Sequence, residues 1–91
     1  MANPIETRMA LDALRVRPLP ERIKGARELF GWTQEILLEC WMIAWRQGWG
    51  VPHPPLRCTV SNWERGHCTP YAKNRQALAF LFGVEGTYFN P

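Results

Sequence analysis

The chain of 91 residues lacks the features of a membrane protein or a secreted, disulfide-bonded protein. No apolar run approaches the roughly 20 residues that a membrane-spanning helix needs, and no signal peptide opens the chain. The three cysteines have no CxxC spacing, so a disulfide framework is not expected. Together with His53 and His67 they offer no ligand pair with zinc-finger spacing, so we expect no metal and no cofactor. The expected setting is the reducing cytoplasm.

Signatures of catalysis are also missing. No Ser/His/Asp or Cys/His arrangement is recognisable, no glycine-rich phosphate loop is present, and the acidic residues are scattered. Cys58 and His67 are the one pair open to a catalytic role, but a helical surface position gives Cys58 a simpler role. Alternating, strand-like segments and internal repeats are absent too. The sequence therefore predicts an all-α protein that is not an enzyme.

The residues that are present favour one small, well-packed and mildly basic domain. Hydrophobic residues make up 46% of the chain, and five residues are tryptophan, which is enough for a single core. The net charge of +3 suits a nucleic-acid partner without demanding one. From residue 57 onward, four basic residues outnumber two acidic ones. The excess positive charge is thus expected in the second part of the chain.

Residues 1–19 predict an additional short N-terminal helix or arm. Asn3 can cap a helix, Pro4 suits its first position, and Glu6 falls where a capping-box acid reaches back. An apolar stripe then recurs about every fourth residue, formed by Ile5, Met9, Ala13 and Val16. We expect this helix to dock on the domain or on a second copy. The alternative is a flexible arm whose arginines track phosphates.

Residues 20–91 predict a compact five-helix domain. A first helix runs from Pro20 to Phe30, and a second begins after Thr33, its N-cap, and ends near Gln47. The second helix is apolar nearly all round, which indicates burial on several sides or a partner. A proline-rich loop follows, and later helices are predicted over residues 57–65, 70–82 and, as one further turn, 84–89.

Trp41, Trp45 and Trp49 fall at intervals of four and would share one side of a helix that persisted that far. Core filling is the preferred interpretation of this stripe, because buried aromatic side chains usually serve packing. A dimer interface or another protein partner at these three tryptophans is the alternative.

Residues 57–66, with the sequence RCTVSNWERG, predict a short helix with two unlike faces. Val60 and Trp63 point to one side, and Gly66 stands where helices commonly end in a left-handed residue. The other side is small, polar and positive, and it comprises Arg57, Cys58, Ser61, Asn62 and Arg65. Such a helix is suited to reading base edges in a major groove. The alternative is an ordinary amphipathic surface helix.

Two motifs carry a resemblance to a known family. GWTQE at residues 31–35, and VSNWERG at residues 60–66 followed by Pro70, resemble the Cro/repressor-type, or Xre family, helix-turn-helix domains. The resemblance covers residues 20–89 and implies five packed helices, the third of which enters the major groove. This chain departs from the family at residues 40–55, where a helical extension and a proline loop replace a tight turn. That turn is either missing or rebuilt by the tryptophans.

The resemblance also implies roles for individual residues. Arg27 and Glu64 match the family's buried ion pair, and a carboxylate beside Trp63 would be costly to bury unpaired. The positions expected to face DNA bases are Arg57, Cys58, Thr59, Ser61 and Asn62. Gln34 matches the family position that contacts phosphate, and Thr33 beside it is expected to do the same. By side-chain chemistry and by position at or just beyond the end of the helix, phosphate contacts are also expected from Arg65, His67, Tyr71, Lys73 and Arg75. For the last five of these, a solvated basic surface is the alternative.

The expected function follows from these roles. Arg57 suits a bidentate contact to guanine and Asn62 one to adenine, each contributing about 1–3 kcal/mol of discrimination. The resemblance thus implies a homodimeric transcriptional regulator, a repressor or autoregulator, that binds a double-stranded DNA operator. The alternative is a protein-interaction adaptor or antitoxin that grips its partner with the apolar second helix.

Overall fold

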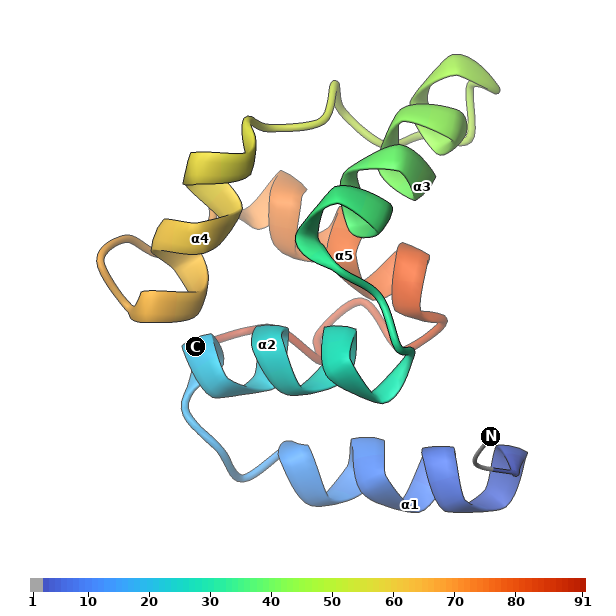
Figure 1. The fold of residues 1–91 in the computed structure, drawn as a ribbon, viewed down its shortest axis with the longest axis vertical. Helices are drawn as coiled ribbons and strands as arrows, with labels where there is room; N and C mark the ends of the chain where they lie inside the picture. The colour runs from blue at the N-terminus through green and yellow to red at the C-terminus, as the bar shows by residue number, and fades with distance from the viewer. Residues whose placement is uncertain (1–2) are drawn as a thin grey trace.

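The computed structural model describes residues 3–91, which form five helices and no strand. The helices are α1 (Pro4–Leu14), α2 (Leu19–Leu29), α3 (Gln34–Arg46), α4 (Arg57–Arg65) and α5 (Ala72–Phe82). Figure 1 shows α2 between α1 on one side and α3 and α4 on the other, with α5 behind. The predicted all-α class is confirmed. None of these helices has the length and hydropathy that crossing a bilayer requires.

The predicted count of helices needs one correction. Only α2 to α5 lie in the region expected to hold five, and α1 is the fifth helix of the molecule. Residues 84–89 contain a turn closed by the N–H of Tyr88 on the carbonyl of Glu85 (3.0 Å). Six residues that include Gly86 are too few to sustain a helix. Tyr88 and Phe89 are nevertheless buried, so this segment seals the core as expected.

Helix ends follow local signals where the chain supplies them. Asn3 caps α1, because its Oδ1 accepts the N–H of Glu6 at 2.8 Å. Gly31 takes the left-handed conformation after α2, with φ of 71°. The start of α5 was predicted wrongly: the helix begins at Ala72 rather than at Pro70, and no side chain caps it.

The core lies where α2 to α5 converge. Its largest fully buried side chains include Trp41, Leu37, Ile23 and Phe89. Around this core, α2 packs against α4 and α5, and α3 packs against the same two helices. This shared core fixes α4 relative to both α2 and α3, which matters for the surface that α4 presents.

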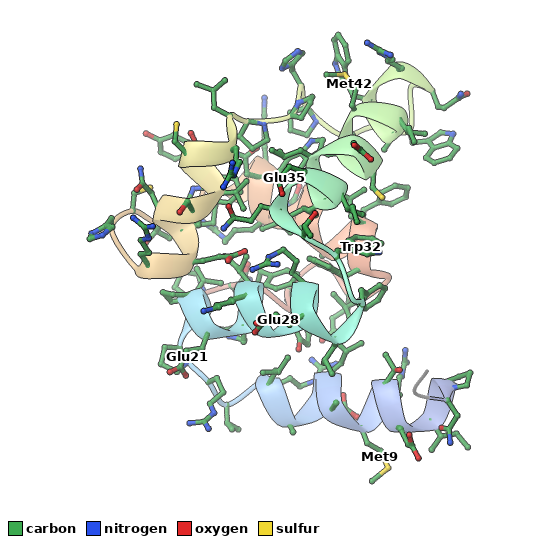
Figure 2. All side chains as sticks on the ribbon, viewed as in Figure 1. Met9, Glu21, Glu28, Trp32, Glu35 and Met42 are labelled. Carbon is green, nitrogen blue, oxygen red and sulfur yellow. The ribbon has the colours of Figure 1, made fainter. Side chains whose placement is uncertain are left out.

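α1 docks on the rest of the domain, at α2, which is one of the predicted alternatives, but by a different face from the predicted one. Leu11 is buried and Leu14 is half-buried, and a Cβ on Gly25 of α2 would lie only 2.8 Å from Leu14 Cδ2. Because Gly25 has no side chain, Leu14 can pack directly against the backbone of α2. The predicted stripe is exposed instead, with Ile5 at 73%, Met9 at 66% and Val16 at 87%. Figure 2 shows Met9 pointing away from α2.

Hydrogen bonds to the C-terminal turn hold α1 in place. Tyr88 donates its hydroxyl to the carbonyl of Leu11 (2.5 Å), and burial raises the pKa of that hydroxyl. Arg22 is buried beside it and donates to the carbonyl of Tyr88 (2.6 Å). Arg15 forms a bidentate ion pair with Glu85. Arg15 is therefore occupied within the fold rather than free on an arm.

Candidate nucleic-acid interface

α4 turns its apolar side inward and leaves its polar side in solvent. Val60 and Trp63 are buried, which confirms the predicted inner face. Gly66 ends the helix with φ of 79°, and its N–H donates to the carbonyl of Trp63 at 3.2 Å. The remaining side carries exposed Arg57, Cys58, Asn62 and Arg65, together with half-buried Thr59 and Ser61. A short helix with an open polar side is thus anchored by one tryptophan.

The expected pair of Arg27 and Glu64 is present and joins α2 to α4. Arg27 Nε and Nη2 donate to the two carboxylate oxygens of Glu64 at 2.8 and 2.9 Å. The pair is largely buried, with 12% of the Arg27 side chain and 5% of the Glu64 side chain exposed. The hydrogen bonds to Glu64 raise the pKa of Arg27. A two-bond contact of this kind fixes orientation as well as distance.

The start of α3 is tied into the same network. Arg27 also donates to the carbonyl of Trp32 (2.7 Å), and the amide nitrogen of Gln34 donates to Glu64 at 3.2 Å. Thr33 caps α3 by accepting the N–H of Ile36 at 3.1 Å. Glu64 thereby links the first turn of α3 to the last turn of α4. The position expected to touch phosphate, Gln34, lies directly beside the outer side of α4.

Tryptophan side chains brace the long connection between α3 and α4. The indole N–H of Trp41 donates to the carbonyl of Pro52 at 2.8 Å, and its ring lies 6.3 Å from that of Trp63. The ring of Trp45 meets His53 at 4.6 Å. Residues 47–56 are therefore held by contacts that a tight turn would not need. Trp41 and Trp45 thus hold this connection in place of a tight turn.

The tryptophan stripe itself breaks up at the end of α3. Only Trp41 fills the core, whereas Trp45 and Trp49 are exposed. The helix ends at Arg46, and Gly48 follows in the left-handed conformation with φ of 72°, so Trp49 leaves the helical register. The core-filling interpretation is thus correct for one of the three residues.

Arg57 lies at the edge of the outer side and has an acidic neighbour. Its Nη1 is 3.1 Å from Glu35 Oε1, with both side chains more than half exposed. The pKa of Glu35 is lowered by its own backbone N–H and, to a lesser degree, by Arg57. An exposed pair of this kind is weak and is screened by salt, so Arg57 remains available to another partner.

Lys24 was missed by the sequence reasoning. It lines a shallow polar hollow between α2, the start of α3 and α4, together with Arg27, Gln34, Ser61, Glu64 and Arg65. Lys24 precedes Arg27 by three residues, so both lie on one face of α2. That spacing was the sequence signal that could have placed Lys24 beside Arg27. Lys24 and Arg65 place two exposed cations around the hollow.

The other expected phosphate contacts lie apart from this hollow. His67 is exposed in the loop after α4, and Tyr71 is exposed before α5. Lys73 lines a different hollow, beside Trp49. Arg75 is half-buried and donates to the carbonyl of Pro70 at 2.7 Å, so it braces a loop. The structure thus brings Gln34 and Arg65 to the hollow beside α4, with Thr33 next to Gln34 in the chain. His67, Tyr71, Lys73 and Arg75 do not line this hollow.

Metal-ligating side chains do not gather anywhere in residues 3–91. No three His, Cys, Asp or Glu side chains in that range are grouped as a metal ion would require. Cys40 is half-buried, and Cys58 and Cys68 are exposed free thiols.

Comparisons of the chain with known protein families, with curated proteins and with solved structures found no match. Its function therefore has to be inferred from the chemistry of this surface.

Proposed function

We propose that this protein binds double-stranded DNA in a sequence-specific manner and regulates transcription, as a repressor or autoregulator, with α4 in the major groove. One observation carries the proposal: Arg27, Glu64 and Gln34 form a partly buried network of hydrogen bonds that fixes the polar side of α4 beside the start of α3. The major groove admits an α-helix, and base readout requires side chains held in a fixed orientation. This arrangement is also what the resemblance to Cro/repressor-type domains implies.

Each exposed side chain of α4 has a distinct role in this proposal. Arg57 forms a bidentate contact with guanine, and Asn62 forms one with adenine. Thr59 and Ser61 bond to a base edge or to a phosphate, and Cys58 is small enough to touch a thymine methyl group. These residues supply the sequence preference.

Phosphate contacts come from the rim of the polar hollow. Arg65 and Lys24 provide positive charge, and the N-terminus of α3 at Thr33 and Gln34 provides backbone N–H groups that favour an anion. Such contacts set the register of the protein on the duplex and carry no sequence information themselves. They make the affinity dependent on salt.

Enrichment of binding sites from a random pool of duplex DNA tests this proposal. We expect one short sequence to emerge, with an affinity that falls linearly on a plot of log K against log salt concentration. The slope measures the number of phosphates neutralised, so Lys24→Ala and Arg65→Ala should each reduce it by about one. A pool that yields no sequence after repeated selection contradicts base reading.

The second candidate function is a protein-interaction adaptor or antitoxin. The observation that favours it is the exposure of Ile43 at 54% and Trp49 at 57%, one near the C-terminal end of α3 and the other just after it. An adaptor would bind DNA weakly and without sequence preference. Capture of a different protein by the wild type but not by Ile43→Glu, combined with no enriched DNA site, would favour this candidate.

A further inference from the structure

An apolar patch between α3 and α5 remains uncovered. It consists of Ile36, Ile43, Trp49 and Phe80, with exposed fractions of 37%, 54%, 57% and 51%. The rings of Trp49 and Phe80 meet edge to face, with centroids 6.3 Å apart. Beside them, Cys40, Ile43 and Phe80 help to line a shallow apolar hollow. This α3–α5 patch thus has a raised part, formed by the rings of Trp49 and Phe80, beside a hollow.

The size of the α3–α5 patch fits one subunit's share of a protein interface. These exposed fractions correspond to roughly 400 Å² of side-chain surface, which lies within the range of about 300–600 Å² for the largest apolar patch of a monomer, a patch that is often functional. A standard interface covers about 800 Å² per partner, of which a little more than half is apolar. The patch would supply nearly all of that apolar area.

Two opposite charges on α3 indicate what covers the patch. Glu39 and Arg46 are exposed and, by helical spacing, share the outer side of α3 with Ile43. Seven residues separate them, or about 10.5 Å along the helix, so they do not pair with each other. Within the part of the chain that the structure describes, neither forms an ion pair with any other residue. The outer side of α3 is therefore acidic before Ile43 and basic after it.

We propose that a second copy of this chain covers the α3–α5 patch, with the two α3 helices antiparallel about a two-fold axis near Ile43. Antiparallel packing brings Glu39 of each copy opposite Arg46 of the other, so the dimer contains two equivalent ion pairs. Each copy also offers the same raised part and hollow, as a two-fold interface requires. A different protein would have to match this charge order by coincidence, whereas a second copy matches it by symmetry.

Sedimentation equilibrium of the full chain without DNA tests the proposal, and it does so independently of the proposed function. We expect the wild type to dimerise and Ile43→Glu to be monomeric. Glu39→Arg and Arg46→Glu should each weaken dimerisation about tenfold or more, because like charges then meet twice across the axis. Arg8→Glu reverses an exposed charge on α1 and should leave the dissociation constant unchanged.

Mixing the two charge-reversed variants separates this geometry from a general loss of stability. In a heterodimer of Glu39→Arg with Arg46→Glu, both charged contacts again join opposite signs, so dimerisation should return. Recovery in the mixture also shows that both variants are folded. A wild type that stays monomeric up to about 100 μM overturns the proposal and leaves the patch to a different protein. A dissociation constant that neither charge reversal changes also overturns it. So does a mixture of the two variants that stays monomeric.

Discussion

Two bidentate arginine–glutamate pairs join distant segments within residues 3–91, and they differ in exposure. Arg27 and Glu64 link α2 to α4 with only 12% and 5% of their side chains exposed. Arg15 and Glu85 link the end of α1 to the C-terminal turn with 44% and 45% exposed. Both are bidentate. Water and salt can replace the exposed pair, whereas a broken buried pair leaves an uncompensated charge. Burial therefore makes the contact under α4 the stronger constraint.

The largest expected effect comes from breaking the buried pair. Glu64→Ala should cost about 3–5 kcal/mol of unfolding free energy, because Arg27 is left buried without a carboxylate. Urea unfolding measures this loss. The double variant Arg27→Met/Glu64→Leu should lose less than the single one, since it removes both charges. Glu85→Ala is the matched control, and a loss equal to that of Glu64→Ala would contradict the comparison.

An intermediate effect is expected at the joint between α3 and α4, which relies on a buried but neutral hydrogen bond. Trp41→Phe removes the donor to the carbonyl of Pro52 and should cost about 1–3 kcal/mol. Amide hydrogen exchange should also accelerate in residues 47–56. Trp45→Phe is the control, because it keeps an aromatic ring beside His53 and removes no hydrogen bond that the structure shows within residues 3–91. Unchanged exchange in Trp41→Phe would show that the loop is held by other contacts.

The smallest expected effect is acid weakening of the exposed pair. The hydrogen bond from Arg15 lowers the pKa of Glu85 from 4.5 to about 2. A lowered pKa means that the pair stabilises the fold above about pH 4.5, and that this contribution is lost as the pH falls toward 2. Urea unfolding of the wild type and of Glu85→Gln at about pH 5 and about pH 3 measures it. The wild type should lose part of its advantage over Glu85→Gln at the lower pH, because that pH lies below 4.5 but still above the lowered pKa of about 2. An unchanged difference would contradict this assignment.

Local features of the fold were predictable, and features set between elements were not. The caps at Asn3 and Thr33 and the helix end at Gly66 depend on side chains within one turn. The buried face of α1 depends on the space above Gly25, which belongs to another helix. Periodicity alone favoured the stripe at Ile5 and Met9, which is the wrong side. Predicting the buried face of α1 correctly would have required knowing that it packs against Gly25 of α2.

The candidate site shows the same division. The ion pair at Glu64 was predictable, because a carboxylate beside Trp63 needs a partner and the resemblance identified Arg27 as that partner. Lys24 escaped notice because its relevance arises only when α2 packs beside α4. Arg75 was expected at phosphates because of its charge, but its bond to the carbonyl of Pro70 depends on where α5 begins. Charge identifies candidates, and packing decides which of them are free.

The most direct measurement of the central claim compares two affinities of one variant. Arg57→Ala should bind the enriched DNA site on the order of 10- to 100-fold more weakly than the wild type does, corresponding to about 1–3 kcal/mol of base discrimination. Its affinity for random-sequence duplex at the same salt concentration should fall much less. Arg8→Ala removes an equal charge from α1 and should affect both duplexes similarly and slightly. Equal losses on the two duplexes for Arg57→Ala would contradict base reading by α4.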